Sequence, residues 1–165
     1  MLFVIVEMKL FGLIHTALLV VGKKPTTWFI DGNNLLGHKG TTNSRDVLAE
    51  RLKPIESAES VVLVFDGRPG ETVNEKFEGN FRLIELGEGM STDDFILNEI
   101  KDIAATSKVR RVQVVTADRQ LRRLALASRP SVKGVINPVT FWRKYLPRMS
   151  GLKKPDVDLD NLSEN

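Results

Sequence analysis

The chain has 165 residues, of which 42% are hydrophobic and 27% are charged, with a formal net charge of +3 at pH 7 and no cysteine. This length suits one globular domain with a real hydrophobic core. The absence of cysteine excludes a disulfide scaffold, thiolate metal sites and cysteine nucleophiles. The small positive charge permits a polyanionic partner without requiring one.

The first 25 residues form an apolar segment that is distinct from the rest of the chain. The run at 10–21 is apolar apart from His15 and Thr16, and it is shorter than the roughly 20 residues that a membrane span needs. Its length matches the apolar part of a targeting sequence, but no small-residue cleavage motif follows. A targeting role, packing onto the domain and an extension outside the fold all stay open. The protein is expected in the cytoplasm, or in a plastid stroma if the segment is a targeting sequence.

Strands and helices alternate from residue 26 to residue 148, which is the expected functional domain. Short apolar, β-branched runs predict strands at 27–31, 60–67, 80–87, 110–118 and 132–138. Apolar residues at helical spacing predict helices at 44–55, 91–105, 119–128 and 140–146. Because the strands do not alternate strictly between apolar and polar residues, we expect a mostly parallel sheet with helices on both faces. Residues 149–165 are expected to form an acidic, flexible tail.

Aspartates stand at the ends of three predicted strands and at the start of one helix. Asp31, Asp66 and Asp118 follow the strands, and Asp93 and Asp94 open the helix. Taken singly, each has an ordinary structural explanation as a turn residue, a helix N-cap or a partner of the helix dipole. Parallel strands, however, bring their carboxyl ends to one edge of a sheet, where ligands bind. The acids are therefore expected to lie near one another.

Helical spacing separates the two acids that open the helix. Asp93 lies one turn before Leu97, on the flank of the apolar face, and is expected to face the sheet. Asp94 shares a face with Asn98 and is expected to lean outward. Clustered carboxylates raise one another's pKa, and a divalent cation removes that penalty. Oxygen ligands without His or Cys nearby suit Mg²⁺ or Mn²⁺ better than Zn²⁺.

Other enzyme classes that use acids in α/β folds fit the sequence less well. A haloacid-dehalogenase-type phosphatase needs a second aspartate two residues after the first, and this chain has Asn33 there. No GxxxxGK[ST] phosphate-binding loop is present. The histidines are His15 and His38, and no G-x-S-x-G nucleophile motif accompanies them.

Four motifs, IDGNNLLG, VVLVFDG, GMSTDDFI and VVTADRQLRR, follow one another in the chain. In this order they resemble the NYN domains of the YacP-like group, over a stretch from about Trp28 to Tyr145. The resemblance implies a PIN-like, three-layer α/β/α sandwich with a mostly parallel central sheet. It also implies a metal-dependent endoribonuclease that uses Mg²⁺ or Mn²⁺. Single-stranded RNA is the partner it suggests, and it leaves an association with the ribosome open.

The resemblance also implies roles for individual side chains. The residues that would hold metal or act in catalysis are Asp31, Asn34, Asp66, Asp93, Asp94 and Asp118. Thr116 stands at the hydroxyl position that the group usually has beside its last acid, where it would orient ligands or water. Asn33 replaces the usual tyrosine, which puts a stacking role at this position in doubt.

Cations near the acids suggest how a polyanion would bind. Arg119, Arg122 and Arg123 follow Asp118 on the same predicted helix, and Lys39 lies in a loop after the first acid. Phosphate contacts of this kind bind nucleic acid without reading its sequence. The sequence also allows two other functions: a catalytically silent RNA-binding module of the same fold, or a magnesium-dependent, phosphatase-like domain. The oligomeric state is not indicated by the sequence.

Overall fold

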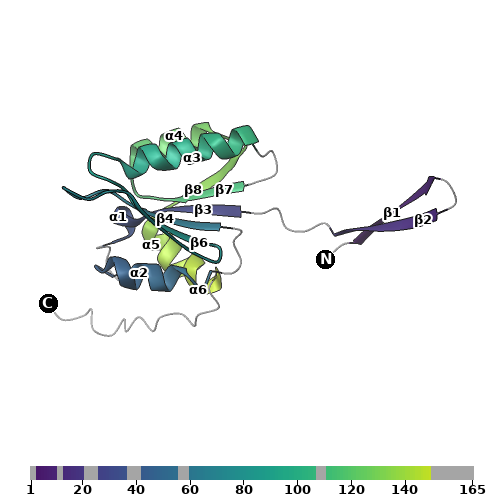
Figure 1. Cartoon of the computed structure of the whole chain (residues 1–165), viewed down its shortest axis with the longest axis horizontal. Helices are drawn as coiled ribbons and strands as arrows, with labels where there is room; N and C mark the ends of the chain where they lie inside the picture. The colour runs from purple at the N-terminus through teal and green to yellow at the C-terminus, as the bar shows by residue number, and fades with distance from the viewer. Residues whose placement is uncertain are drawn as a thin grey trace.

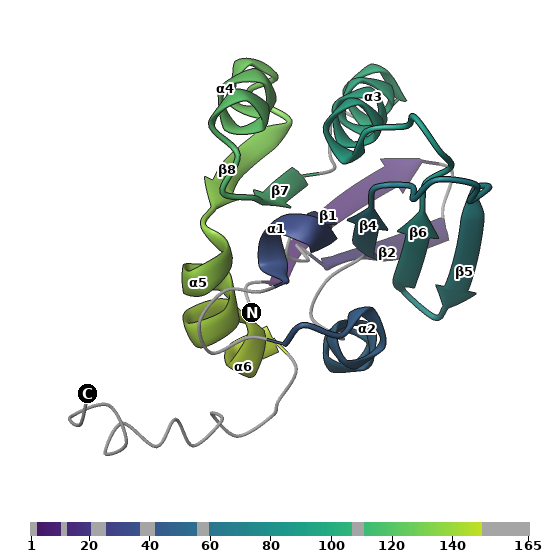
Figure 2. The same ribbon diagram turned by 90° about the vertical axis from the view of Figure 1, so that its left-hand side faces the viewer.

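A six-stranded sheet forms the centre of the domain in this computed structural model, which describes residues 3–10, 13–20, 26–36, 42–55, 60–106 and 111–149. Its strands are β3 (Thr26–Asp31), β4 (Ser60–Phe65), β5 (Asn74–Glu78), β6 (Phe81–Glu85), β7 (Arg111–Val115) and β8 (Val132–Ile136). They lie in the order β5-β6-β4-β3-β7-β8 (Figures 1 and 2). Neighbours run parallel, except that β5 is antiparallel to β6. The carboxyl ends of β3, β4 and β7 therefore reach the same edge.

Helices cover both faces of the sheet, so the domain has three layers (Figures 1 and 2). One face carries α3 (Thr92–Thr106) and α4 (Arg119–Ala127). The other face carries α2 (Arg45–Leu52), α5 (Pro138–Thr140), the π-helix η1 (Phe141–Tyr145) and α6 (Leu146–Met149). A short helix, α1 (Gly32–Leu35), follows β3 directly. This arrangement confirms the predicted three-layer α/β/α fold with a mostly parallel sheet.

The two faces of the central strands enter two separate hydrophobic cores. Trp28 and Ile30 of β3 pack with residues of α2 and η1, whereas Phe29 packs with residues of α3 and α4. Phe29 and Ile30 are both 0% exposed. Burial on both faces explains why this strand reads as a continuous apolar run rather than as an alternating one.

The apolar segment at the start of the chain contains two strands of its own. β1 (Phe3–Leu10) pairs antiparallel with β2 (Leu13–Val20) in a separate two-stranded sheet. We did not expect a hairpin here from the sequence, and a targeting role for the segment stays a prediction. Across the described residues, we find no helix with the length and apolar character that crossing a bilayer requires. The predicted acidic tail after Met149 lies outside the described residues.

Candidate active site

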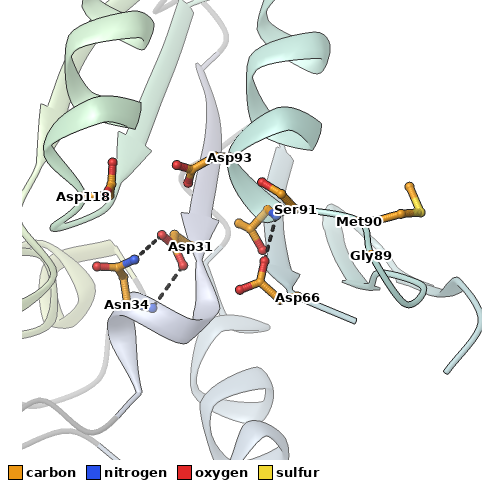
Figure 3. A pocket seen from close by; sticks show the side chains of 9 residues that line it. Asp31, Asn34, Asp66, Gly89, Met90, Ser91, Asp93 and Asp118 are labelled. Carbon is orange, nitrogen blue, oxygen red and sulfur yellow. Dashed lines mark hydrogen bonds between the residues drawn. The ribbon is translucent and has the colours of Figure 1, made fainter. Parts of the chain in front are cut away.

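Asp31 is fixed at the carboxyl end of β3 by a set of short-range hydrogen bonds. The residue is 2% exposed, and it caps α1 because its Oδ1 accepts a hydrogen bond from the backbone N–H of Asn34 at 3.0 Å. The Asn34 side-chain amide donates to Oδ2 (Figure 3). Oδ2 also accepts from the hydroxyl of Thr116 at 3.0 Å. These donors hold the carboxylate in one orientation.

Thr116 ties the ends of two neighbouring strands together. It follows β7, is 2% exposed, and donates to Asp31 while its Oγ1 accepts from the backbone N–H of Asp118 at 3.0 Å. A second link joins the same two segments, because the N–H of Ala117 donates to the side-chain oxygen of Asn34 at 3.3 Å. The structure therefore places Thr116 against Asp31, behind the acids, where the resemblance would put a residue that orients them.

Asp118 combines a structural role with a place at the site. It is the N-cap of α4, since its Oδ1 accepts from the backbone N–H of Leu121 at 2.7 Å. Its side chain also lines the same pocket as Asp31 (Figure 3). The capping explanation and the functional explanation of this residue are thus compatible.

Asp66 braces the short helix after β3 against the start of α3. Its Oδ1 accepts from the backbone N–H of Thr92 at 2.8 Å, and its Oδ2 accepts from the side-chain amide of Asn33. Asn33, which the sequence left without a role, therefore orients an acid. We could not have found this pair from local sequence signals, because the two residues are 33 positions apart.

Four carboxylates from separate segments line one pocket of about 390 Å³. The residues of its wall are Asp31, Asn34, Asp66, Gly89, Met90, Ser91, Thr92, Asp93 and Asp118 (Figure 3). Asp93 lies in this pocket, whereas Asp94 lines a neighbouring one together with Asn98. The helical spacing predicted this difference in direction. Residues 89–92 also line the pocket and were not among the predicted site residues, although they directly precede the two acids in the sequence.

Burial and neighbouring negative charges raise the pKa of two carboxylates in the pocket. The pKa of Asp93 is raised to about 6, first by burial and then by the charges of Asp118, Asp31 and Asp66, with a last contribution from Asp94. The pKa of Asp31 is also raised, mainly by burial and partly by the charge of Asp66, although the hydrogen bonds from Asn34 and Thr116 act in the opposite direction. Raised carboxylate pKa values indicate a site that lacks positive charge.

The pocket offers the type of donor atom that a hard divalent cation prefers, but its side chains do not form a complete set of metal ligands. Its charged groups are carboxylates, and oxygen ligands are those that Mg²⁺ and Mn²⁺ prefer. Within the described ranges, however, no three acidic or histidine side chains lie close enough to hold a metal ion together. The close convergence that we expected of Asp31, Asp93 and Asp118 is therefore not found. Mg²⁺ commonly uses one or two carboxylates with waters and substrate phosphates, which this pocket can supply.

Three of the predicted RNA-binding residues lie on the helix that begins at the pocket wall. Arg119, Arg122 and Arg123 are exposed on α4, which starts directly after Asp118 of the pocket wall. Lys39 lies in the segment 37–41, outside the described residues. The structure thus brings the three arginines and an acid of the site onto the same helix.

Burial of Asp93 predicts a pH-dependent effect on stability. Since its folded pKa is about 6 and the ordinary value is near 4, the folded state binds this proton more tightly than the unfolded state does. Ionisation therefore costs stability as the pH rises from about 4 to about 6, and the cost persists above. At pH 7.5, without divalent ions, Asp93→Asn should raise the free energy of unfolding by about 1 kcal/mol, a value reduced for solvent screening.

Urea denaturation at pH 7.5 and at pH 4 measures this effect. Asp94→Asn is the matched control, because it removes a neighbouring charge from the same helical turn while its side chain is exposed. We expect the stability difference between the two variants to vanish at pH 4. An Asp93→Asn variant less stable than Asp94→Asn at pH 7.5 would contradict the electrostatic account.

Comparison with known proteins supports the fold. No protein-family model matches the sequence, and no curated protein matches it. A crystal structure of a mutant form of Rae1 (YacP) from Bacillus subtilis is similar, with a TM-score of 0.57 and 16% sequence identity. The match covers 76% of this chain and 77% of that chain. This chain has a YacP-like fold. At this level of identity the likeness concerns the architecture alone, and the chemistry of this chain depends on its own residues.

Proposed function

We propose that this protein is a divalent-metal-dependent endoribonuclease whose active site is the carboxylate pocket at the edge of the sheet. One observation carries the proposal: Asp31, Asp66, Asp93 and Asp118 come from four separate segments and line a single pocket. Burial, together with the charges of the other three carboxylates, raises the pKa of Asp93 to about 6. A site that concentrates uncompensated negative charge in this way is suited to a bound cation. The motifs that resemble YacP-like NYN domains support the choice of RNA as substrate.

The residues that would hold Mg²⁺ or Mn²⁺ are Asp31, Asp93 and Asp118, with Asp66 as a fourth carboxylate in the same pocket wall. When bound, such a cation supplies positive charge that neutralises phosphate oxygens and lowers the pKa of water. Asp66 already accepts hydrogen bonds on both oxygens, so we expect it to act mainly by holding the start of α3 in place. Asp94 faces the neighbouring pocket, and we expect it to contribute charge rather than direct contact.

The chain's own hydrogen bonds prepare the site before any ligand arrives. Thr116 and Asn34 hold the Asp31 carboxylate, and this fixed orientation spares the protein a rearrangement when a phosphate is bound. Asn34 and Thr116 would thus act on the acids rather than on the RNA. Arg119 at the start of α4 would contact the phosphate backbone next to the pocket. An association with the ribosome is a further prediction of the resemblance.

A cleavage assay tests the proposal. We expect purified protein to cut a labelled single-stranded RNA internally in Mn²⁺ or Mg²⁺, and to lose this activity in EDTA and in the Asp118→Asn variant. RNA binding without cleavage in any divalent ion would instead favour a silent binding module. Hydrolysis of a chromogenic phosphate ester that RNA does not inhibit would favour a phosphatase-like function. Cleavage that persists in EDTA would refute the metal-dependent mechanism.

A further inference from the structure

The charges on the two sides of the pocket have opposite signs. Residues 111–136 carry six lysines and arginines but one acid, Asp118. Residues 60–106 carry ten acids and four lysines and arginines. The first stretch contains β7, α4 and β8, and the second contains β4, β5, β6 and α3. Because β8 and β5 are the two opposite edges of the sheet, this division of the sequence becomes a division in space (Figure 2).

The cations on the β8 side are exposed and available to a polyanion. The exposed cations of α4, β8 and the turn between them are Arg119, Arg122, Arg123, Arg129 and Lys133. The ion pairs found within the described ranges use cations from elsewhere, namely Arg45, Lys53, Arg68 and Arg82. We define the five exposed cations of α4, β8 and their turn as the basic track. With no acid paired to them in the described part of the chain, they present their full charge to phosphates.

The opposite side of the pocket repels a phosphate chain. A second pocket of about 280 Å³ adjoins the first and shares the loop at 89–91 with it. Its wall includes the carboxylates of Asp94, Glu99 and Asp102. A nucleic acid strand that left the active-site pocket in this direction would pass the carboxylates of Asp94 and Asp102, whereas the charge of Glu99 is offset by Arg82 at 3.4 Å. Exposed charges repel a phosphate chain that comes within the screening length, which is about 8 Å at physiological salt.

We propose that the RNA strand is held on one side of the scissile phosphate only, along the basic track, so that cleavage occurs at one end of the bound stretch. The position of the cut relative to the basic track rests on the proposed function, because it assumes that cleavage occurs in the carboxylate pocket. The basic track itself follows from the charges and the strand order. Nucleotides on the α3 side of the cut make no phosphate contacts with the protein. They therefore add little to affinity and are dispensable for cleavage.

A matched pair of double variants tests where the phosphates bind. All variants carry Asp31→Asn, so that the RNA is not cut while binding is measured. The first double variant, Arg122→Gln with Arg123→Gln, neutralises two charges of the basic track. The control, Lys76→Gln with Lys101→Gln, neutralises two exposed cations on the acidic side. With a 20-nucleotide single-stranded oligouridylate, we expect the first pair to weaken binding about tenfold at physiological salt and to lower the salt slope by about 1.4. The control pair should change the affinity less than about twofold.

The outcomes separate this proposal from the proposed function. A loss of RNA affinity in the arginine double variant, but not in the lysine double variant, supports the basic track. If the wild-type protein then cuts no RNA, the nuclease function fails and the basic track stands. Equal losses in both pairs, or the absence of salt-dependent RNA binding, overturn the track.

Substrate truncation tests the one-sided footprint directly. Oligonucleotides with one fixed cleavage site are shortened stepwise from the 5′ end or from the 3′ end, and the cleavage rate of the wild-type protein is followed. We expect one series to keep its rate until the shortened end lies about two nucleotides from the cut, whereas the other loses its rate much earlier. Similar losses from both ends would show a symmetric footprint and would overturn the proposal.

Discussion

Asp31→Asn should lower the rate of RNA cleavage by a factor of about a thousand or more while leaving the protein folded. The carboxylate lies in the wall of the pocket and is almost fully buried, so an amide in its place removes negative charge from the point where a cation is needed. The variant keeps the shape of the side chain, and its amide oxygen can still accept the hydrogen bond from the N–H of Asn34, whereas its NH₂ group cannot accept from the Asn34 amide and the Thr116 hydroxyl. Since burial raises the pKa of Asp31, the neutral variant also avoids the cost of a buried charge. Initial rates on a labelled RNA and a thermal melt together measure the effect.

Asp102→Asn is the control for this experiment. It makes the same chemical change at an exposed acid of α3 that is absent from the wall of the active-site pocket. We expect its cleavage rate to stay within about twofold of the wild type, because surface substitutions away from a site have small effects. Near-normal turnover in Asp31→Asn would end the proposed mechanism, since no other acid stands at the end of β3.

Gly67→Ala should reduce the free energy of unfolding by about 3 kcal/mol or more. A Cβ at this position would lie 2.1 Å from the carbonyl oxygen of Gly87 and 2.4 Å from that of Leu86. Both obstacles are backbone atoms, and Leu86 is tied to the end of β4 by a hydrogen bond of 2.9 Å to the carbonyl of Phe65. The clash must therefore push the two segments apart. Urea denaturation followed by far-UV circular dichroism measures the loss.

The same substitution should also impair the site, because Gly67 directly follows Asp66. A shift of the backbone there would weaken the hydrogen bonds that Asp66 accepts from Thr92 and Asn33. Gly87→Ala is the matched control across the contact, since its Cβ would meet nothing closer than 3.4 Å. We expect it to cost less than about 1 kcal/mol. Equal stability of the two alanine variants would show that the close approach at Gly67 is not a constraint.

The strands and helices with a buried face could be predicted from the sequence. The runs that became β3, β4, β6, β7 and β8 are apolar because each lies inside the sheet or beneath a helix. β5 was missed for the corresponding reason. All five residues of Asn74–Glu78 are exposed, so the strand has no buried face to produce an apolar pattern, and it forms through pairing with β6.

The acids of the site could be predicted from the sequence, but the hydrogen bonds that hold them in place could not. The strand ends identified Asp31, Asp66 and Asp118, and the helical phase correctly directed Asp93 to the pocket and Asp94 away from it. Nothing in the local sequence indicated that Asn33 would hold Asp66 or that Thr116 would hold Asp31. The second pair is separated by 85 positions. Such contacts depend on which strands become neighbours, and the order of strands in a sheet is a long-range property.

Periodicity and the chemistry of single residues were enough to establish an α/β fold with carboxylates at one edge of its sheet, because burial and backbone preference act over a few residues. Whether those carboxylates would share one pocket, and how tightly, depended on packing between segments far apart in the chain. The packing brought four acids to one pocket and raised the pKa of Asp93, yet it left no three of them at metal-ligand spacing among the described residues. Distances of an ångström or two decide such a site, and only the folded arrangement of β3, β4, β7 and α3 sets them.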